Sequence, residues 1–170
     1  MLTDSCLLIL LVIAVIFDLK ERRIPNWLIL SGVVMAFTYQ GYIEGYSGLW
    51  SCFQGLAIGM ALLFIPFAMG GIGAGDVKLL GMIGALKGST FVIGSFLWVA
   101  VWGGLIAVVI LIIHKRLGET LQRIGRGLVL SGLGAAKISD CVQKDELSIY
   151  YPYGVAIALG VLTSYGRGWW

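Results

Sequence analysis

The stretch 7–17, LLILLVIAVIF, decides the fold class, because this apolar run leads directly into the aspartate Asp18. A carboxylate at the end of such a run is costly in a bilayer unless it is paired, neutral or open to water. A second aspartate, Asp76, follows the glycine-rich stretch 70–75, GGIGAG, and precedes another apolar segment. Because a carboxylate at such a position costs free energy, both acids are the first candidates for a functional site.

The composition is that of an integral membrane protein. Of the 170 residues, 59% are hydrophobic and 12% are charged, whereas soluble domains carry about 25% charged residues. The mean hydropathy is +0.94. The net charge of +3 does not predict nucleic-acid binding, since the basic residues lie in short loops and fit membrane topology better. We expect one membrane-embedded domain over residues 1–170, surrounded by the lipid bilayer.

Apolar runs of membrane-spanning length recur along the chain. A bilayer-spanning helix needs about 20 mostly apolar residues. On this rule the sequence predicts an all-α bundle of about six transmembrane helices, near residues 5–19, 27–43, 49–69, 77–86, 91–113 and 150–165. The segment 77–86 offers only about 18 Å of apolar helix. It must therefore borrow length from the glycine-rich loop, lie in a thinned bilayer, or stop short of the far side.

The basic residues predict the orientation. If the loop after the first helix is cytoplasmic, only Lys87 and Arg167 of the 12 Lys and Arg residues fall on the outer side, as the positive-inside rule requires. Asp18 and Asp76 then both lie at cytoplasmic helix ends, where one site can contain them. For the segment at about 115–146, a basic amphipathic helix on the inner leaflet and a solvated connector are equally good interpretations.

Two carboxylates that come together cannot both ionise easily, so they share a proton. One then acts as general base on a water molecule and the other as general acid. Because such a pair titrates as a unit, neither Asp18 nor Asp76 receives a fixed role. Gly73 and Gly75 would form the loop that presents Asp76, since glycine permits close backbone approach or positive φ.

Each acid also has a purely structural interpretation. Asp18 would be a solvated interfacial residue paired with Lys20 or Arg22, and Asp76 would be a helix N-cap. A single glycine would suffice for a turn, so capping alone does not explain the loop 70–75. Lys78, two residues after Asp76, is expected to point elsewhere and to extend toward the phosphates; a supporting role in biasing the charge of the pair is the weaker alternative.

Metal and disulfide chemistry receive no support from the sequence. The cysteines Cys6, Cys52 and Cys141 are scattered, without a CxxC pair or any partner at metal-ligand spacing. We therefore expect no metal and no cofactor.

Three motifs resemble those of the type IV prepilin peptidases. Residues 18–26, DLKERRIPN, are similar to the first-aspartate signature of that family, and residues 73–79, GAGDVKL, to its G-x-G-D-x-K-L signature. Residues 151–156, YPYGVA, resemble the P-[YF]-G-x-A segment that opens the final helix of the family. The three motifs occur in the family order and cover the chain nearly end to end.

This resemblance implies a membrane-embedded aspartyl protease with Asp18 and Asp76 as its catalytic pair. Pro152, Tyr153 and Gly154 are the supporting residues that the third motif implies. The expected reaction removes the short basic leader of a prepilin at the cytoplasmic face of a bacterial or archaeal cytoplasmic membrane. The expected partners are this prepilin, with its leader and apolar helix, and the lipid bilayer, but no nucleic acid.

The resemblance also indicates a subtype. Bifunctional members of the family carry a cytosolic domain with CxxC pairs and N-methylate the new N-terminus, whereas this sequence shows no such domain. It looks like the short form associated with tight-adherence (Flp) pilus systems, and methylation is not expected. The substrate helix is expected to pack against small residues such as Gly55, Gly59 and Ala61. The sequence indicates neither the natural prepilin nor the oligomeric state.

Two other functions use the same residues. A small proton or ion carrier would use the aspartates as a relay, but their shallow, same-side placement and the lack of an internal repeat disfavour it. A non-catalytic membrane subunit of a pilus-assembly machine would have no need for both acids and the glycine-rich loop.

Overall fold

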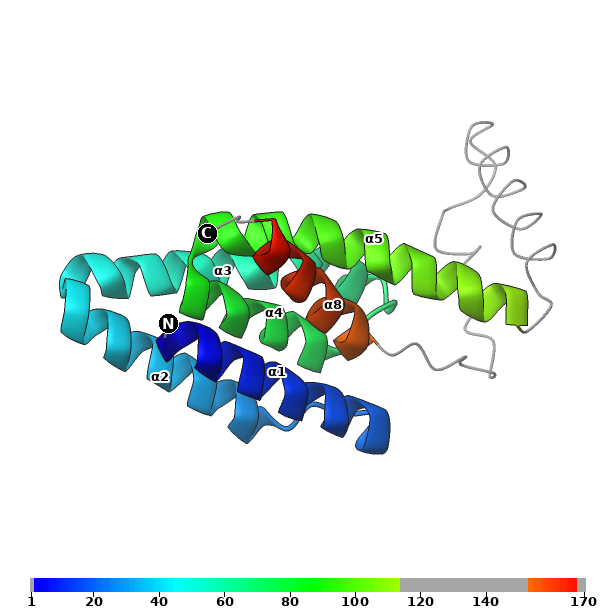
Figure 1. The fold of residues 1–170 in the computed structure, drawn as a ribbon, viewed down its shortest axis with the longest axis horizontal. Helices are drawn as coiled ribbons and strands as arrows, with labels where there is room; N and C mark the ends of the chain where they lie inside the picture. Colours follow the sequence, from blue (N-terminus) through cyan, green and yellow to red (C-terminus); the bar gives the residue numbers. More distant parts are fainter. Residues whose placement is uncertain (1, 114–152, 168–170) are drawn as a thin grey trace. The chain divides into compact units, whose positions relative to one another are not determined.

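A computed structural model describes residues 2–113 and 153–167. The described residues form the helices α1 (Leu2–Glu21), α2 (Asn26–Glu44), α3 (Tyr46–Ala68), α4 (Ala74–Lys87), α5 (Ser89–Ile113) and α8 (Tyr153–Gly166) (Figure 1). These residues contain no strand, which confirms the predicted all-helical class for this part of the chain. The predicted amphipathic segment 115–146 lies outside the described residues.

The chain divides into two compact units. Residues 1–103 and 152–170 form the first unit, and residues 104–151 form the second. Of the second unit the structure describes residues 104–113, the end of α5. Both aspartates and all helices except that end of α5 belong to the first unit.

Two of the described helices are suited to cross a bilayer by length and composition alone. They are α3 over Tyr46–Ala68 and α5 over Ser89–Ile110, and α8 is a shorter apolar helix. The apolar character of these helices agrees with a membrane protein. The number of spans stays a prediction.

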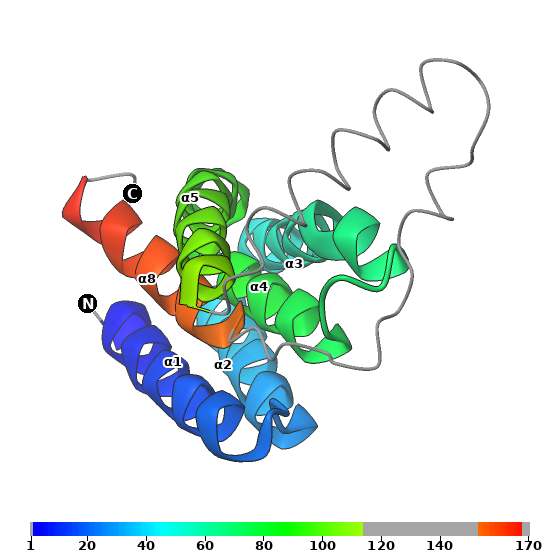
Figure 2. The same cartoon turned by 90° about the vertical axis from the view of Figure 1, so that its right-hand side faces the viewer.

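Helix α4 is the central helix of the first unit. Nine of its residues are buried: Val77, Leu79, Leu80, Gly81, Met82, Ile83, Gly84, Ala85 and Leu86. It contacts α1, α2, α3 and α8 (Figure 2), and a helix that is apolar all round is typical of such a buried position. The helix starts at Ala74, so the last two residues of the glycine-rich stretch 70–75 belong to the helix.

The backbones of α3 and α4 touch through glycine. A Cβ atom at Gly55 would overlap the carbonyl oxygen of Gly84, and one at Gly59 would collide with the backbone of Leu80 and Gly81. Small residues allow such close helix packing. The expectation that Gly55 and Gly59 receive the substrate helix is therefore wrong, because α4 already occupies that side of α3. Ala61 stays exposed.

Candidate active site

Asp18 is buried in the last turn of α1. Only 7% of its surface is exposed, although Leu19 and Lys20 beside it are exposed. Its Oδ2 accepts a hydrogen bond of 3.0 Å from the backbone N–H of Gly154 in the first turn of α8. A Cβ atom at Gly154 would lie 2.7 Å from this oxygen, so the approach requires glycine. This burial excludes the interpretation of Asp18 as a solvated interfacial residue.

The chain turns sharply directly after α1. Arg22 has a φ of 55°, in the left-handed region, and its N–H donates to the carbonyl oxygen of Asp18 at 3.1 Å. A residue other than glycine is uncommon there and costs roughly 1–2 kcal/mol. The turn brings Arg22, Arg23 and the buried Ile24 to one side of a cavity near Asp18.

Asp76 lies in the first turn of α4, where Gly73 is the N-cap residue. The N–H groups of Asp76 and Val77 donate to the carbonyl oxygen of Gly73 at 3.2 and 3.4 Å. The interpretation of Asp76 as the N-cap is thus wrong by three residues, although a first-turn carboxylate still interacts favourably with the helix dipole. Its Oδ1 is buried and has no hydrogen-bond partner among the described residues. Such an atom calls for an explanation, for example a water or ligand that occupies the site.

One cavity of about 330 Å³ brings the two aspartates together. It lies where α1 ends and where α2 and α4 begin, and its lining comprises Asp18, Arg22, Arg23, Ile24, Asn26, Gly73, Ala74, Gly75, Asp76 and Lys78. The predicted loop residues Gly73 and Gly75 therefore share this cavity with both acids.

The charges of the two acids interact. Asp76 precedes the apolar stretch 77–86 and lies outside the predicted span. Burial and, to a smaller degree, the charge of Asp18 raise the pKa of Asp76 to about 6, against the opposing effect of a hydrogen bond from the Gly73 backbone. Near neutral pH this carboxyl group exchanges its proton readily, as a general acid or base must.

Gly73 and Gly75 allow close approach of neighbouring atoms rather than an unusual backbone angle. Gly73 has an ordinary φ of −76°, and a Cβ atom there would lie 3.2 Å from the Oδ2 of Asp76. A Cβ atom at Gly75 would lie 3.3 Å from the Cβ of Ile24. Both contacts are tight, so the neighbouring atoms would have to shift slightly for a methyl group.

Lys78 lines the cavity, so the expectation that it points elsewhere is wrong. Its Nζ donates to the Oδ1 of Asn26 at 3.1 Å, and this acceptor at the start of α2 holds the ammonium at the rim. Asn26 is a site residue that the sequence analysis did not single out. Its place at the end of the first motif, I-P-N, was the available signal.

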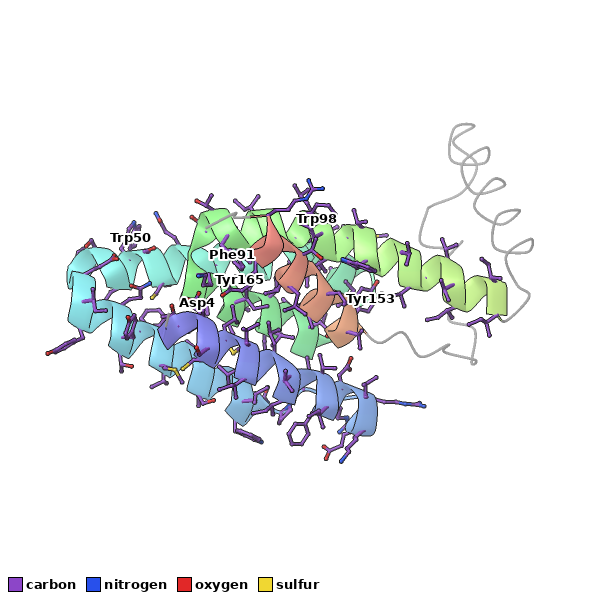
Figure 3. The ribbon with its side chains drawn as sticks, in the orientation of Figure 1. Asp4, Trp50, Phe91, Trp98, Tyr153 and Tyr165 are labelled. Carbon is purple, nitrogen blue, oxygen red and sulfur yellow. The ribbon has the colours of Figure 1, made fainter. Side chains whose placement is uncertain are left out.

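The start of α8 approaches the same site. Gly154 contacts Asp18 as described, and Tyr153 (labelled in Figure 3) directly precedes it at the start of α8. Two of the three residues implied by the third motif thus lie near the aspartates. Pro152 lies outside the described residues. The described residues contain no group of three or more His, Cys, Asp or Glu side chains arranged to hold a metal ion.

The described residues are all helical or in the turns between helices, and two aspartates from different helices line one cavity. This combination is a candidate site of the carboxylate-pair type. Residues 5–108 match the type IV leader peptidase family. The match covers more than half of the chain and includes both Asp18 and Asp76, so this chain belongs to the type IV leader peptidase family. Comparison with curated proteins and with solved structures gave no match.

Proposed function

We propose that this protein is an aspartyl endopeptidase that removes the basic leader of a type IV prepilin, with Asp18 and Asp76 as the catalytic pair. The observation that carries the proposal is the single cavity that both carboxylates line, although they come from different helices. Membership of a peptidase family favours this reaction over a proton carrier or an inactive assembly subunit.

The proposed mechanism needs only the two acids and a water molecule. The pair shares one proton, so the ionised carboxylate removes a proton from water while the other protonates the scissile carbonyl oxygen. The C–N bond of the resulting tetrahedral diol breaks when the protonated aspartate gives its proton to the leaving amine. The other aspartate takes back a hydroxyl proton of the diol, so the pair again holds one proton. The partnerless Oδ1 of Asp76 is suited to bind the water or the peptide carbonyl. The hydrogen bond from Gly154 fixes the orientation of Asp18.

The charge of the cavity rim affects which part of the substrate can be recognised. Arg22, Arg23 and Lys78 line it, and we place this end of the bundle at the cytoplasmic side of a cytoplasmic membrane. A basic leader gains nothing from a basic rim. Recognition should therefore rest on the apolar helix of the prepilin and on the depth of the scissile bond. Our proposal keeps the short, Flp-type form without methyltransferase activity.

The direct test is cleavage of a prepilin by the purified protein in lipid vesicles, followed by mass spectrometry of the product. Asp18→Asn and Asp76→Asn should each lower the rate by at least about 10³-fold, since each removes one of the proton-transferring groups. Glu44→Gln, which changes an exposed carboxylate at the end of α2, should cleave as the wild type does. Retained cleavage in either aspartate variant would overturn the proposed function.

A further inference from the structure

Four side chains form a polar and aromatic cluster at the helix ends away from the cavity. Lys87, at the end of α4, forms an ion pair with the Oδ1 of Asp4, near the start of α1. The hydroxyl of Tyr165, near the end of α8, donates to the same oxygen at 3.0 Å. The Nζ of Lys87 also lies 5.4 and 5.1 Å from the ring centroids of Phe91 and Tyr165. We call Asp4, Lys87, Phe91 and Tyr165 the clasp; three of them are labelled in Figure 3.

Three helices run from the clasp to the candidate active site. Helix α1 carries Asp4 near one end and Asp18 near the other, and α8 carries Tyr165 and Gly154 in the same way. Helix α4 carries Lys87 at its end and Asp76 in its first turn. Asp4 thus pairs with Lys87 at one end of the antiparallel pair α1 and α4, and the two aspartates share the cavity at its other end.

A helix behaves as a stiff rod, so a contact at one end fixes the position of the other. If α4 slid along α1 by one turn, Asp76 would move by about 5.4 Å relative to Asp18. The glycine contacts of α4 fix its register against α3 alone, and its other buried residues are apolar, which specifies register poorly. A directional polar contact removes that ambiguity, as polar residues do at helix interfaces.

We propose that the clasp is a positioning device that fixes the register of α1, α4 and α8, and so brings Asp18 and Asp76 to their working separation. Asp4 and Lys87 are positioning residues in this proposal, since they lie at the opposite ends of α1 and α4 from the two aspartates. This inference rests on the proposed function of the aspartate pair.

The surroundings of the clasp suit this role. The side chains of Lys87 and Asp4 are 11% and 24% exposed, so solvent screens their attraction less than on an open surface. The hydrogen bond from Lys87 holds the pKa of Asp4 well below its ordinary value, and the one from Tyr165 acts in the same direction. Asp4 therefore stays ionised, and the clasp intact, over the pH range in which Asp76 gains or loses its proton.

The first test is kinetic. Lys87→Met removes the charge but keeps the length of the side chain, and it should lower kcat by roughly 10–100-fold with little change in KM, because small misplacements of catalytic groups have such effects. Its pH–rate profile should shift as well, since the coupling between the two acids changes with their separation. Lys87→Arg, which keeps the ion pair, should restore kcat. Asp4→Asn provides a milder second variant if Lys87→Met folds poorly.

A matched control separates positioning from general stability. Thr163→Val removes the hydrogen bond of 2.9 Å that Thr163 accepts from the Nε1 of Trp102, between α5 and α8. It should lower the melting temperature while kcat and the pH–rate profile stay those of the wild type. If Lys87→Met and Thr163→Val change kcat equally at equal loss of stability, the clasp is only a stabilising cluster and the proposal is wrong.

A second readout does not depend on catalysis. Asp18→Cys and Asp76→Cys are combined in a chain whose three native cysteines are replaced by alanine, and a short bis-maleimide links the introduced thiols. Adding Lys87→Met should slow cross-linking at least severalfold, and an unchanged cross-linking rate would overturn the positioning role. Because cross-linking needs no activity, failure of the clasp proposal is distinct from failure of the proposed peptidase function, which the asparagine variants test.

Discussion

The two ends of α4 differ in how their polar groups are satisfied. At its C-terminal end Lys87 has an ion pair and two aromatic rings around it. At its N-terminal end Asp76 keeps a buried oxygen without a hydrogen-bond partner among the described residues. A paired, partly buried charge restrains a fold, whereas an unsatisfied buried polar group is tolerated where function requires it. The comparison fits our two proposals, which place positioning at one end of α4 and catalysis at the other.

Apart from the aspartate variants, the largest effect is expected at Gly154, which connects α8 to Asp18 through a hydrogen bond. Gly154→Ala places a methyl group against the carboxylate of Asp18 and displaces the hydrogen bond that it accepts. We expect cleavage to fall roughly 10–100-fold. The matched control is Gly166→Ala in the same helix, where a Cβ atom would meet nothing within 4 Å. Equal activity of the two variants would show that α8 does not help to orient Asp18.

The second prediction concerns the pH dependence of the stability that Asp76 contributes. The pKa of Asp76 is raised from 3.8 to about 6 in the folded protein, so the folded state binds more protons than the unfolded state between these values. Stability should therefore fall as pH rises from 4.5 to 7, by about 2 kcal/mol for this group alone. Thermal unfolding at both pH values, in the wild type and in Asp76→Asn, isolates this contribution. If the two proteins show the same pH dependence, Asp76 is not a buried acid with a raised pKa.

The smallest effect is expected at Gly75, in the first turn of α4. Gly75→Ala adds a methyl group 3.3 Å from the Cβ of Ile24, so the start of α4 must shift slightly. Alanine also favours the helix by about 1 kcal/mol. We expect cleavage to slow by a few fold while the melting temperature stays level or rises. The reason is that the added methyl group perturbs only the end of α4 that carries Asp76. A variant that loses stability but cleaves normally would contradict the assignment of roles to the two ends.

The sequence was sufficient to predict that the two acids come together and to predict most helix bounds. A carboxylate that ends an apolar run is conspicuous, and Asp18 and Asp76 do line one cavity. The predicted helix 27–43 lies within one residue of α2, Asn26–Glu44, at each end. These features depend on local composition, which a sequence displays directly.

The contacts that the sequence could not predict are long-range. Gly55 and Gly59 signal close packing, but their partner α4 is determined only by the tertiary fold. Asp4 and Lys87 are 83 positions apart, and neither has a neighbour in sequence that indicates the clasp. Lys78 turns toward the cavity because Asn26, from another helix, supplies its acceptor.

The central claim is that Asp18 and Asp76 act as one catalytic unit. The most direct test compares Asp18→Asn, Asp76→Asn and the double variant in the same vesicle assay of prepilin cleavage. Groups that act as a unit are strongly non-additive, so each single variant should fall to the residual rate of the double variant. The claim would be contradicted if the cleavage rate of the double variant fell by the product of the two single fold-losses. It would also be contradicted if either single variant retained cleavage.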